Sequence, residues 1–337
     1  MMTEASINHE QIGLSDEDVL RMYETMYLAR KIDERMWLLN RAGKIPFVIS
    51  CQGQEAAQVG AAFALDNTKD YIAPYYRDMG VVLHFGMTAQ DLMLSAFAKA
   101  EDPNSGGRQM PGHFGQKKNR ILTGSSPVTT QVPHAVGVAL TAKIQKEDYI
   151  AFVTLGEGSS NQGDFHEGAN FAGVHKLPVV IMVENNQYAI SVPMERQIAS
   201  KQVSDRAIGY GMPGVTVDGK NPLAVYQVVK EAATRARNGE GPSLIEAVTF
   251  RLTAHSSDDD DRQYRTAEDI AEGRAKDPII LFAHYLTEKG ILTNTLEQEI
   301  QSRVQQIVNE ATDYAEQAAY ALPEHAMRYV YAEGEES

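Results

Sequence analysis

Glu157 lies between Gly156 and Gly158, and a pair of asparagines, Asn185 and Asn186, follows, the second 29 positions after Glu157. A carboxylate oxygen, an amide oxygen, a nearby backbone carbonyl and diphosphate oxygens would form the all-oxygen shell that Mg²⁺ prefers. The two glycines would let the backbone approach a bulky group closely. Taken alone, an acid between two glycines is more often an ordinary strand-to-helix turn, so the chemistry depends on whether the asparagines lie beside it.

The residues around this motif predict a strand–helix–strand unit that would bring Glu157 and Asn186 together. Residues 151–155 and 178–183 are short apolar runs, as expected of buried strands. Between them, residues 161–175 carry apolar side chains near helical spacing. Strands joined by such a crossover pair in parallel, and ligands bind at their carboxyl ends in open α/β sheets. The free N–H groups at the start of the helix would suit a phosphate in the same crevice.

The rest of the chain predicts an α/β fold with a doubly wound, mostly parallel sheet and helical extensions at both ends. Helices are expected over residues 15–42, 53–65, 88–99, 131–145, 222–238 and 266–320, and strands over 70–75, 215–217 and 243–250. The expected division is an N-terminal helical arm (1–45), an α/β domain (46–265), and a C-terminal helical extension and tail (266–337). Residues 1–14 should form a loose polar arm, and residues 333–337 an acidic tail.

Composition and charge exclude several classes of function. The net charge of −14 argues against a nucleic-acid partner, and it means that a diphosphate site needs its own local cations. No apolar run approaches the roughly 18 residues that span a bilayer, so no membrane association is expected. The amino terminus shows no signal peptide, and the single cysteine, Cys51, fits a reducing compartment. These features predict a cytoplasmic protein.

Four other polar segments could belong to a site, and each also has a purely structural interpretation. Arg77 follows a predicted strand and could instead form a surface salt bridge. His113, in a loop rich in glycine and proline, could carry a proton or only support the loop. The hydroxyl-rich turn 124–131 could hold a cofactor ring or a monovalent cation, or simply cap the next helix. Residues 251–265 include four consecutive aspartates, which are usual in solvated loops, but the flanking arginines and His255 could order them.

Glu157 followed by Asn186 resembles the fingerprint of the thiamine diphosphate enzymes, in which the acid, the second asparagine and a carbonyl two residues later bind the metal. The third ligand here would be the backbone of Tyr188. Three further segments, at Tyr76-Arg77, 125–127 and His255-Ser256, resemble the alpha subunit of the first, decarboxylating component of 2-oxo acid dehydrogenase complexes. Residues 107–111 and the loop ending at Tyr264-Arg265 resemble the branched-chain members. The resemblance extends from about Ile32 to Arg265.

This resemblance implies a role for each matching residue. Tyr76, Arg77 and His255, with the backbone at Gly158 and Ser159, would contact the diphosphate, and His255 would also be catalytic. Ser126 and Val128 would contact the aminopyrimidine. Ser125, Pro127, Thr130 and Gln131 match a potassium site. Arg251, Asp259, Tyr264 and Arg265 would order the loop that carries His255. Glu184 stands where animal branched-chain enzymes have an arginine, so one phosphate contact is absent or supplied elsewhere.

Phe47 and Ile49 would line the substrate pocket. Pyruvate enzymes commonly carry a histidine at the position of Ile49, so an apolar residue there favours a branched-chain substrate.

The function that the resemblance implies needs other subunits. With a beta subunit, in an α2β2 heterotetramer, the chain would use thiamine diphosphate and magnesium to decarboxylate branched-chain 2-oxo acids, and the acyl group would pass to the lipoyl group of a partner acyltransferase. The glutamate that assists cofactor deprotonation in the family belongs to a second domain, which the beta subunit would supply. Alternatives are a pyruvate or acetoin dehydrogenase alpha subunit, a nicotinamide oxidoreductase, which should carry a Gly-x-Gly-x-x-Gly motif after a strand, and a non-catalytic scaffold subunit.

Overall fold

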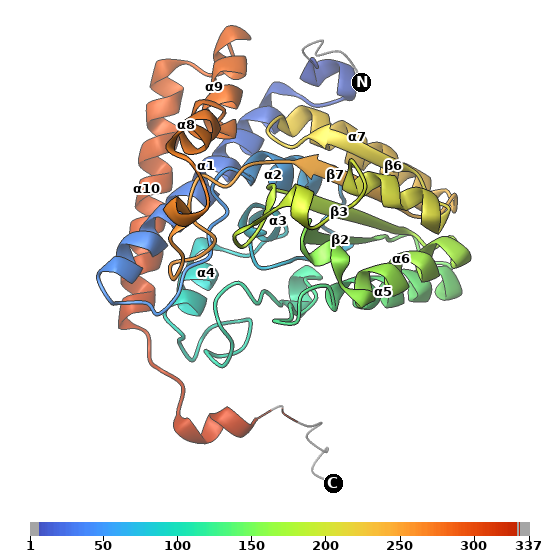
Figure 1. The fold of residues 1–337 in the computed structure, drawn as a ribbon. Coiled ribbons are helices and arrows are strands. Elements are labelled where there is room, and N and C mark those ends of the chain that lie inside the picture. The colour runs from blue at the N-terminus through green and yellow to red at the C-terminus, as the bar shows by residue number, and fades with distance from the viewer. Residues whose placement is uncertain (1–6, 329, 331–337) are drawn as a thin grey trace.

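A parallel sheet forms the centre of the protein, whose computed structural model describes residues 7–328 and residue 330 (Figure 1). Within this part of the chain the sheet has five strands, in the order β1 (Tyr71–Ala73), β2 (Ala151–Gly156), β3 (Val179–Asn185), β7 (Ser243–Val248) and β6 (Gly214–Asp218). Every pairing between them is parallel. The predicted strand–helix–strand unit is confirmed, because β2 and β3 pair directly, with Ala151 opposite Val179.

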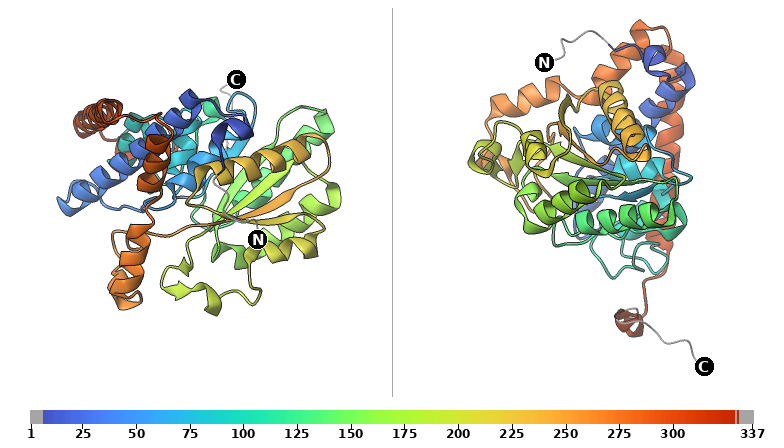
Figure 2. Two further views of the ribbon diagram at one scale, coloured as in Figure 1. Left: turned by 90° about the horizontal axis from the view of Figure 1, so that it is seen from above. Right: turned by 90° about the vertical axis from the view of Figure 1, so that its right-hand side faces the viewer.

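Helices cover both faces of this sheet, which confirms the predicted doubly wound α/β fold (Figures 1 and 2). One face packs against α5 (Gln131–Gln145), α6 (Gly163–His175) and the 3-10 helix η5 (Val203–Tyr210). The other packs against α2 (Glu55–Phe63), α3 (Met79–His84) and α7 (Pro222–Arg237). Because β2 and β3 are buried on both faces, their side chains form continuous apolar runs.

The terminal helices extend the core on the α2 side. Helix α1 (Asp16–Arg41) begins with a capping box between Ser15 and Asp18 and packs against α2, α9 (Pro278–Glu288) and α10 (Asn294–Gln317). Helix α10 also packs against α4 (Ala89–Ala96). These helices share one apolar cluster with the sheet face behind them. The division of the chain at residues 45 and 265 stays a prediction.

The single helical stretch expected over residues 266–320 is instead three helices, α8 (Ala267–Ala275), α9 and α10. Pro278 stands at the first position of α9, capped by Asp277, so α8 cannot continue through it. Gly290 has φ of +73°, which turns the chain before Thr293 caps α10. Other expected elements are present with their ends moved, and the short hairpin of β4 (Tyr188–Ala189) and β5 (Val192–Pro193) was not expected.

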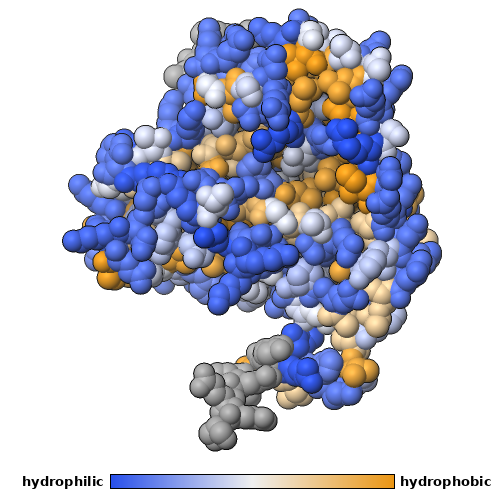
Figure 3. All heavy atoms as spheres, turned by 180° about the vertical axis from the view of Figure 1, so that it is seen from behind, coloured by the Kyte–Doolittle hydropathy of each residue, from blue (hydrophilic) through white to orange (hydrophobic). Residues whose placement is uncertain are grey.

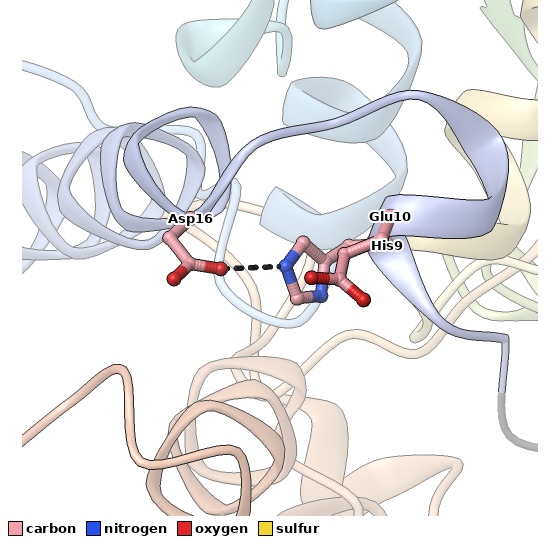
Figure 4. Close-up of side chains that lie close together, drawn as sticks. All are labelled: His9, Glu10 and Asp16. Atoms are coloured by element: carbon pink, nitrogen blue, oxygen red, sulfur yellow. Dashed lines mark hydrogen bonds and ion pairs between the residues drawn. The ribbon is translucent and has the colours of Figure 1, made fainter.

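The expectation of a loose polar arm is wrong for residues 9–12, which form a 3-10 helix. His9 is buried, and its Nδ1 lies 2.8 Å from the Tyr285 hydroxyl. Its Nε2 lies 2.9 Å from Asp16 Oδ1, the contact drawn in Figure 4. Among the described residues, His9, Glu10 and Asp16 are the one group of three or more His, Cys, Asp and Glu side chains close enough to share a metal ion. Both ring nitrogens of His9 are already engaged, so the group fits a contact that docks this segment on α1 and α9. Residues 1–6 and the predicted acidic tail, 333–337, lie outside the described residues.

Large apolar side chains remain exposed on several helices. Ile144 on α5, Val174 on α6 and Ile208 on η5 are each more than two-thirds exposed. Viewed from behind, the surface shows apolar patches among hydrophilic ones (Figure 3). Within residues 7–328 and 330, none of the helices combines the length and apolarity needed to cross a bilayer.

The buried cation of α1 generates a prediction about stability. Arg30 donates through Nε to Glu55 Oε1 (2.6 Å) and through Nη1 to Asp277 Oδ2 (2.7 Å), which ties α1 to the starts of α2 and α9. Arg30→Ala would leave the fully buried Glu55 carboxylate without its cation, so we expect the free energy of unfolding to fall by about 3–5 kcal/mol. Urea unfolding followed by circular dichroism measures this.

The matched control is Arg303→Ala, which removes an exposed pair with Glu24 between α10 and α1. It should cost at most about 1 kcal/mol. Equal losses for the two variants would contradict the prediction.

Candidate active site

The carboxyl ends of four neighbouring strands meet at a topological switch point. The chain leaves β2 toward α6 on one face of the sheet, and it leaves the neighbouring β1 toward α3 on the other face. Ligands bind in the crevice that such a divergence opens. Arg77 follows β1, Glu157 follows β2, Asn186 follows β3 and His255 follows β7. The topology therefore gathers residues spread over much of the chain at one edge of the sheet.

Glu157 is a buried carboxylate with one free oxygen. Its residue is 1% exposed, and Oε1 has no hydrogen-bond partner among the described residues. Burial raises the pKa of Glu157, and backbone hydrogen bonds at Glu157 and Asn186, together with the charge of Arg251, oppose that rise. A buried anionic oxygen without a donor is costly, and a bound cation would compensate it. The residues present therefore fit a metal ion.

The two asparagines have different surroundings. The backbone N–H of Asn186, the predicted ligand, donates to the Glu157 carboxylate, and its side-chain Oδ1 accepts a hydrogen bond from the Tyr188 N–H (3.3 Å). Between them, Gln187 has φ of +73°, which few residues other than glycine adopt. This tight turn places Asn186 and Tyr188, two of the three predicted metal ligands, beside the third, Glu157.

Gly158 is required for packing against the next turn. A Cβ at this position would lie 2.4 Å from Ala189 Cβ, whereas a Cβ at Gly156 would meet nothing closer than 3.9 Å. The Glu157 turn can therefore approach the β4 hairpin only because residue 158 has no side chain. The helix expected from residue 161 begins at Gly163, after the 3-10 helix η3 (Ser159–Asn161).

Arg77 is buried, only 2% exposed, and takes no part in a surface salt bridge. Its Nη1 donates to the Ser50 carbonyl (2.7 Å), and its Nη2 lies 2.9 Å from both the His255 carbonyl and His255 Nδ1. The guanidinium also lies over the ring of Tyr76, 5.3 Å from its centroid. These contacts fix a cation at the switch point of an otherwise acidic protein.

His255 is neutral, and its tautomer follows from its neighbours. Nδ1 lies within hydrogen-bonding distance of Arg77 Nη2 (2.9 Å) and Arg251 Nη1 (3.3 Å), and arginine can only donate. The proton must therefore be on Nε2. Burial, followed by the charges of Arg77 and Arg251, lowers the pKa of His255 to about 3. This geometry suits hydrogen-bond donation from Nε2–H at neutral pH.

The loop that carries His255 is ordered by its own charges. Asp259 accepts from the His255 N–H (2.7 Å) and from the Tyr264 hydroxyl, which in turn accepts from Arg251 Nη2 (3.1 Å). Arg265 donates to Asp261 (3.1 Å) and lies over the Phe250 ring. The run of four aspartates is therefore engaged in part with the arginines that flank it.

A small cavity beside these groups brings together several residues predicted to contact the cofactor or to hold potassium. Its lining includes Tyr76, Ser125, Val128, Gln131 and Ser159. Ser126 is exposed. His113 Nδ1–H donates to the Met110 carbonyl (2.8 Å), which leaves Nε2 as an acceptor. Nε2 accepts a hydrogen bond from the Ser126 hydroxyl (2.6 Å). His113 therefore connects its own loop with the hydroxyl-rich turn.

The remaining predicted residues lie around this centre. Thr130 donates to the Pro127 carbonyl, and Gln131 Nε2 donates to the Thr154 carbonyl (3.0 Å). Neither contact tests whether these residues hold a potassium ion, so the potassium site stays a prediction. Phe47 and Ile49 are half-buried, in a segment whose Val48 pairs with Ser257, next to the His255 loop. Their place in a substrate pocket also stays a prediction.

Glu184 points away from this site. It is fully buried on the α2 side of the sheet, where it accepts from Gln58 Nε2 (3.1 Å) and the Tyr75 hydroxyl (3.3 Å). Burial, with the charge of the nearby Asp78, raises the pKa of Glu184 well above its usual range. A phosphate contact at the site must therefore come from other residues.

A family model described as "Dehydrogenase E1 component" matches residues 23–324 of this chain. The chain belongs to this family. It is 69% identical to the 2-oxoisovalerate dehydrogenase subunit alpha of Bacillus subtilis over 324 residues, 96% of this chain and 98% of that protein. It is 38% identical to the 3-methyl-2-oxobutanoate dehydrogenase subunit alpha of Mycobacterium tuberculosis over 332 residues, 95% of this chain and 84% of that protein. The pyruvate dehydrogenase E1 component subunit alpha of Staphylococcus aureus is 36% identical over 316 residues, 92% of this chain and 82% of that protein.

The predicted family is therefore confirmed, and membership among the E1 components implies the use of thiamine diphosphate. Since the match is to a dehydrogenase component along most of the chain, it disfavours both the nicotinamide oxidoreductase and the scaffold interpretations.

Two residues that support the site of this E1 chain were missed in the sequence. Asp33, on the core side of α1, accepts from the Cys51 N–H (2.6 Å), the Ser50 hydroxyl (3.0 Å) and Gln52 Nε2 (2.9 Å), and so fixes the carbonyl that holds Arg77. The signal for Asp33 in the sequence was an acidic residue on the apolar face of a predicted helix. Arg206 donates to Ser160 and Asn161 in η3, and no sequence pattern indicates this contact.

The surroundings of His255 generate a prediction about its protonation in the cofactor-free protein. The pKa of His255 in the folded protein lies below its value near 6.5 in the unfolded chain. As the pH falls, the unfolded chain therefore takes up this proton before the folded protein does. His255 thus lowers the free energy of unfolding as the pH falls from about 6.5 toward 3. ¹⁵N NMR of histidine-labelled protein, with the His255→Gln variant for assignment, should show the neutral Nε2–H tautomer from pH 8 to pH 5. A midpoint near 6.5 would contradict this arrangement.

The free oxygen of Glu157 generates a prediction about the metal. Glu157→Ala removes a buried charge, so the midpoint of thermal unfolding should stay equal or rise. The same change should weaken Mg²⁺-dependent binding of thiamine diphosphate by about a hundredfold or more, as measured by calorimetry. Glu195→Ala, which removes an exposed carboxylate from the same region, is the control. If Glu157→Ala binds the cofactor like the wild type, Glu157 does not bind the metal.

Proposed function

We propose that this chain is the alpha subunit of a branched-chain 2-oxo acid dehydrogenase, the E1 component that decarboxylates its substrate with thiamine diphosphate. The observation that carries the proposal is the buried Glu157 carboxylate, with one free oxygen, beside Asn186 at the switch point. The choice of substrate class is supported by 69% identity to the 2-oxoisovalerate dehydrogenase subunit alpha of Bacillus subtilis. Identity to the pyruvate dehydrogenase relative is much lower, at 36%.

The residues at this edge would divide the work of holding the cofactor. Glu157, Asn186 and the Tyr188 carbonyl would bind Mg²⁺, and Arg77 would balance the negative charge of the diphosphate. Ser126 and Val128 would contact the aminopyrimidine ring, and Ser125, Pro127, Thr130 and Gln131 would hold a potassium ion. When bound, thiamine diphosphate supplies the stabilised carbanion that a decarboxylation needs.

His255 would act through its Nε2–H. Arg77 and Arg251 occupy the Nδ1 side, so the opposite ring nitrogen is the one left to donate a hydrogen bond to the diphosphate or to a reacting oxygen. Asp259, Tyr264, Arg251 and Arg265 would keep the loop in place while this happens. A donor held in one tautomer needs no reorganisation when charge develops on the substrate.

The enzyme would require other subunits. We expect a beta subunit in an α2β2 heterotetramer and a lipoylated acyltransferase that receives the acyl group. The exposed Ile144, Val174 and Ile208 are consistent with subunit contacts, because large exposed apolar side chains in groups mark interaction surfaces. A cytoplasmic location is also expected.

The substrate is tested by kinetics on the reconstituted enzyme. If Ile49 lines the pocket, each methylene buried against it gains roughly 0.8 kcal/mol, so branched substrates should be preferred over pyruvate. The ratio of kcat/KM for 3-methyl-2-oxobutanoate to that for pyruvate should be tens-fold or more.

The purified chain without the beta subunit is the control and should show no turnover. A ratio near one, or one that favours pyruvate, would point to the pyruvate or acetoin alternative. Turnover by the chain alone would contradict the need for a beta subunit.

A further inference from the structure

Glu246, near the middle of β7, is a second buried carboxylate close to the site, and none of the roles described above uses it. It is 1% exposed. Side chains alternate along a strand, and Leu244 packs into the core on the α5–α6 side, so Glu246 faces that side as well. A carboxylate buried there needs strong hydrogen bonds to offset its loss of water. Its donors indicate what the charge is used for.

Both oxygens of Glu246 accept hydrogen bonds, and the donors come from three different segments. Oε1 accepts from Asn185 Nδ2 at the end of β3 (2.6 Å). Oε2 accepts from the Ser204 N–H in η5 (3.0 Å) and from the Thr216 hydroxyl in β6 (3.2 Å). One anion therefore joins β3, β6 and η5 to β7.

The Asn185 bond reaches the first ligand-bearing turn. With Nδ2 held by Glu246, Asn185 directs Oδ1 at the Gln187 N–H, from which it accepts a hydrogen bond of 2.9 Å. Gln187 is the residue with φ of +73°, a conformation that needs such support. The turn formed in this way presents Asn186 and Tyr188. The first asparagine of the pair thus shapes the turn from which the second reaches the site.

The Ser204 bond reaches the second ligand-bearing turn. Ser204 lies near the start of η5, and Arg206 follows on the same 3-10 helix. Arg206 donates to the carbonyl and hydroxyl oxygens of Ser160 and to Asn161 Oδ1. The Ser160 hydroxyl donates to the carbonyl of Glu157 itself. A short series of hydrogen bonds therefore runs from Glu246 to the turn that carries the predicted charged ligand.

We propose that Glu246 is a positioning residue that holds the Glu157 turn and the Asn186 turn at the spacing a divalent cation requires. The inference rests on the proposed magnesium site and assigns its supporting residues. Groups that orient metal ligands from behind commonly change metal affinity by about 10–100-fold when they are replaced. Glu246 acts through Asn185 on one side and through η5 on the other.

The test is Glu246→Gln in the full-length chain bound to its beta subunit. Glutamine keeps the shape of the side chain, but its NH₂ group replaces one of the two oxygens that now accept hydrogen bonds. A donor facing that NH₂ group loses its acceptor, so either the bond to Asn185 or the bond to Ser204 must break. Calorimetry with thiamine diphosphate and varied Mg²⁺ should show affinity for Mg²⁺ lowered by about 10–100-fold. Asn185→Ala should also weaken binding, and the double variant should lose less than the sum of the two single losses.

The matched control lies on the same strand. Ser243 is buried, and its hydroxyl has no partner among the described residues, so Ser243→Ala should leave the affinity for Mg²⁺ unchanged. Its effect should add to that of Glu246→Gln without coupling. Wild-type affinity in Glu246→Gln would overturn the proposal.

Hydrogen exchange of the cofactor-free complex gives a readout that does not depend on the metal. In Glu246→Gln, the amides of Ser204 and Gln187 should exchange faster, whereas those of β2 should not change. Faster exchange across the whole sheet would mean that Glu246 only stabilises the fold, and would overturn a positioning role. If the wild type fails to bind thiamine diphosphate, the proposed function fails, and the exchange pattern alone then decides whether Glu246 holds both turns.

Discussion

The site depends on how Arg77 is held. A buried guanidinium must have its donors satisfied, and Arg77 uses them to join segments that are far apart in the chain, donating to Ser50 before the first strand and lying against His255 after the last central one. Asp33 fixes the Ser50 segment from α1, and Asp259 fixes the His255 loop. Because each of these groups loses its partner if another moves, the surroundings of the cation behave as one unit.

The same arrangement explains why a strongly acidic chain can bind an anionic cofactor. Its net charge of −14 would repel a diphosphate at long range, but Arg77 and Arg251 are both buried at the switch point, where water screens their charges less than at the surface. Burial, together with the charges of these two arginines beside His255 Nδ1, also keeps the histidine neutral. Local placement of two cations therefore outweighs the average charge of the protein.

Alternation along β3 separates supporting residues from those at the site. Glu184 faces α2 and is bound by Gln58 and Tyr75, whereas Asn185 faces the opposite side and is bound by Glu246. The strand then ends, and Asn186 lies on the turn beyond it. Three consecutive polar residues thus have three separate surroundings. Periodicity explains the first two, and the end of the strand explains the third.

The sequence by itself determined the elements with strong local signals. Neighbouring residues alone define the apolar runs of β2 and β3, so the sheet and its parallel pairing could be predicted. The capping box at Ser15 is equally local, so the start of α1 could be predicted as well. The motif around Glu157 and Asn186 could be recognised because its spacing is that of one strand–helix–strand unit. The break of the C-terminal helix at Pro278 was missed, although proline signals it locally.

Only the tertiary structure decided which polar side chain meets which. The tautomer of His255 follows from arginines 178 and 4 positions away, and the role of Asp33 follows from a loop that packs against it. Arg206 and Glu246 reach the site through η5, a 3-10 helix that was not predicted from the sequence. Hydrogen bonds between distant segments depend on the direction in which each side chain leaves the folded backbone. That direction is set by packing of the whole chain, which a local pattern does not contain.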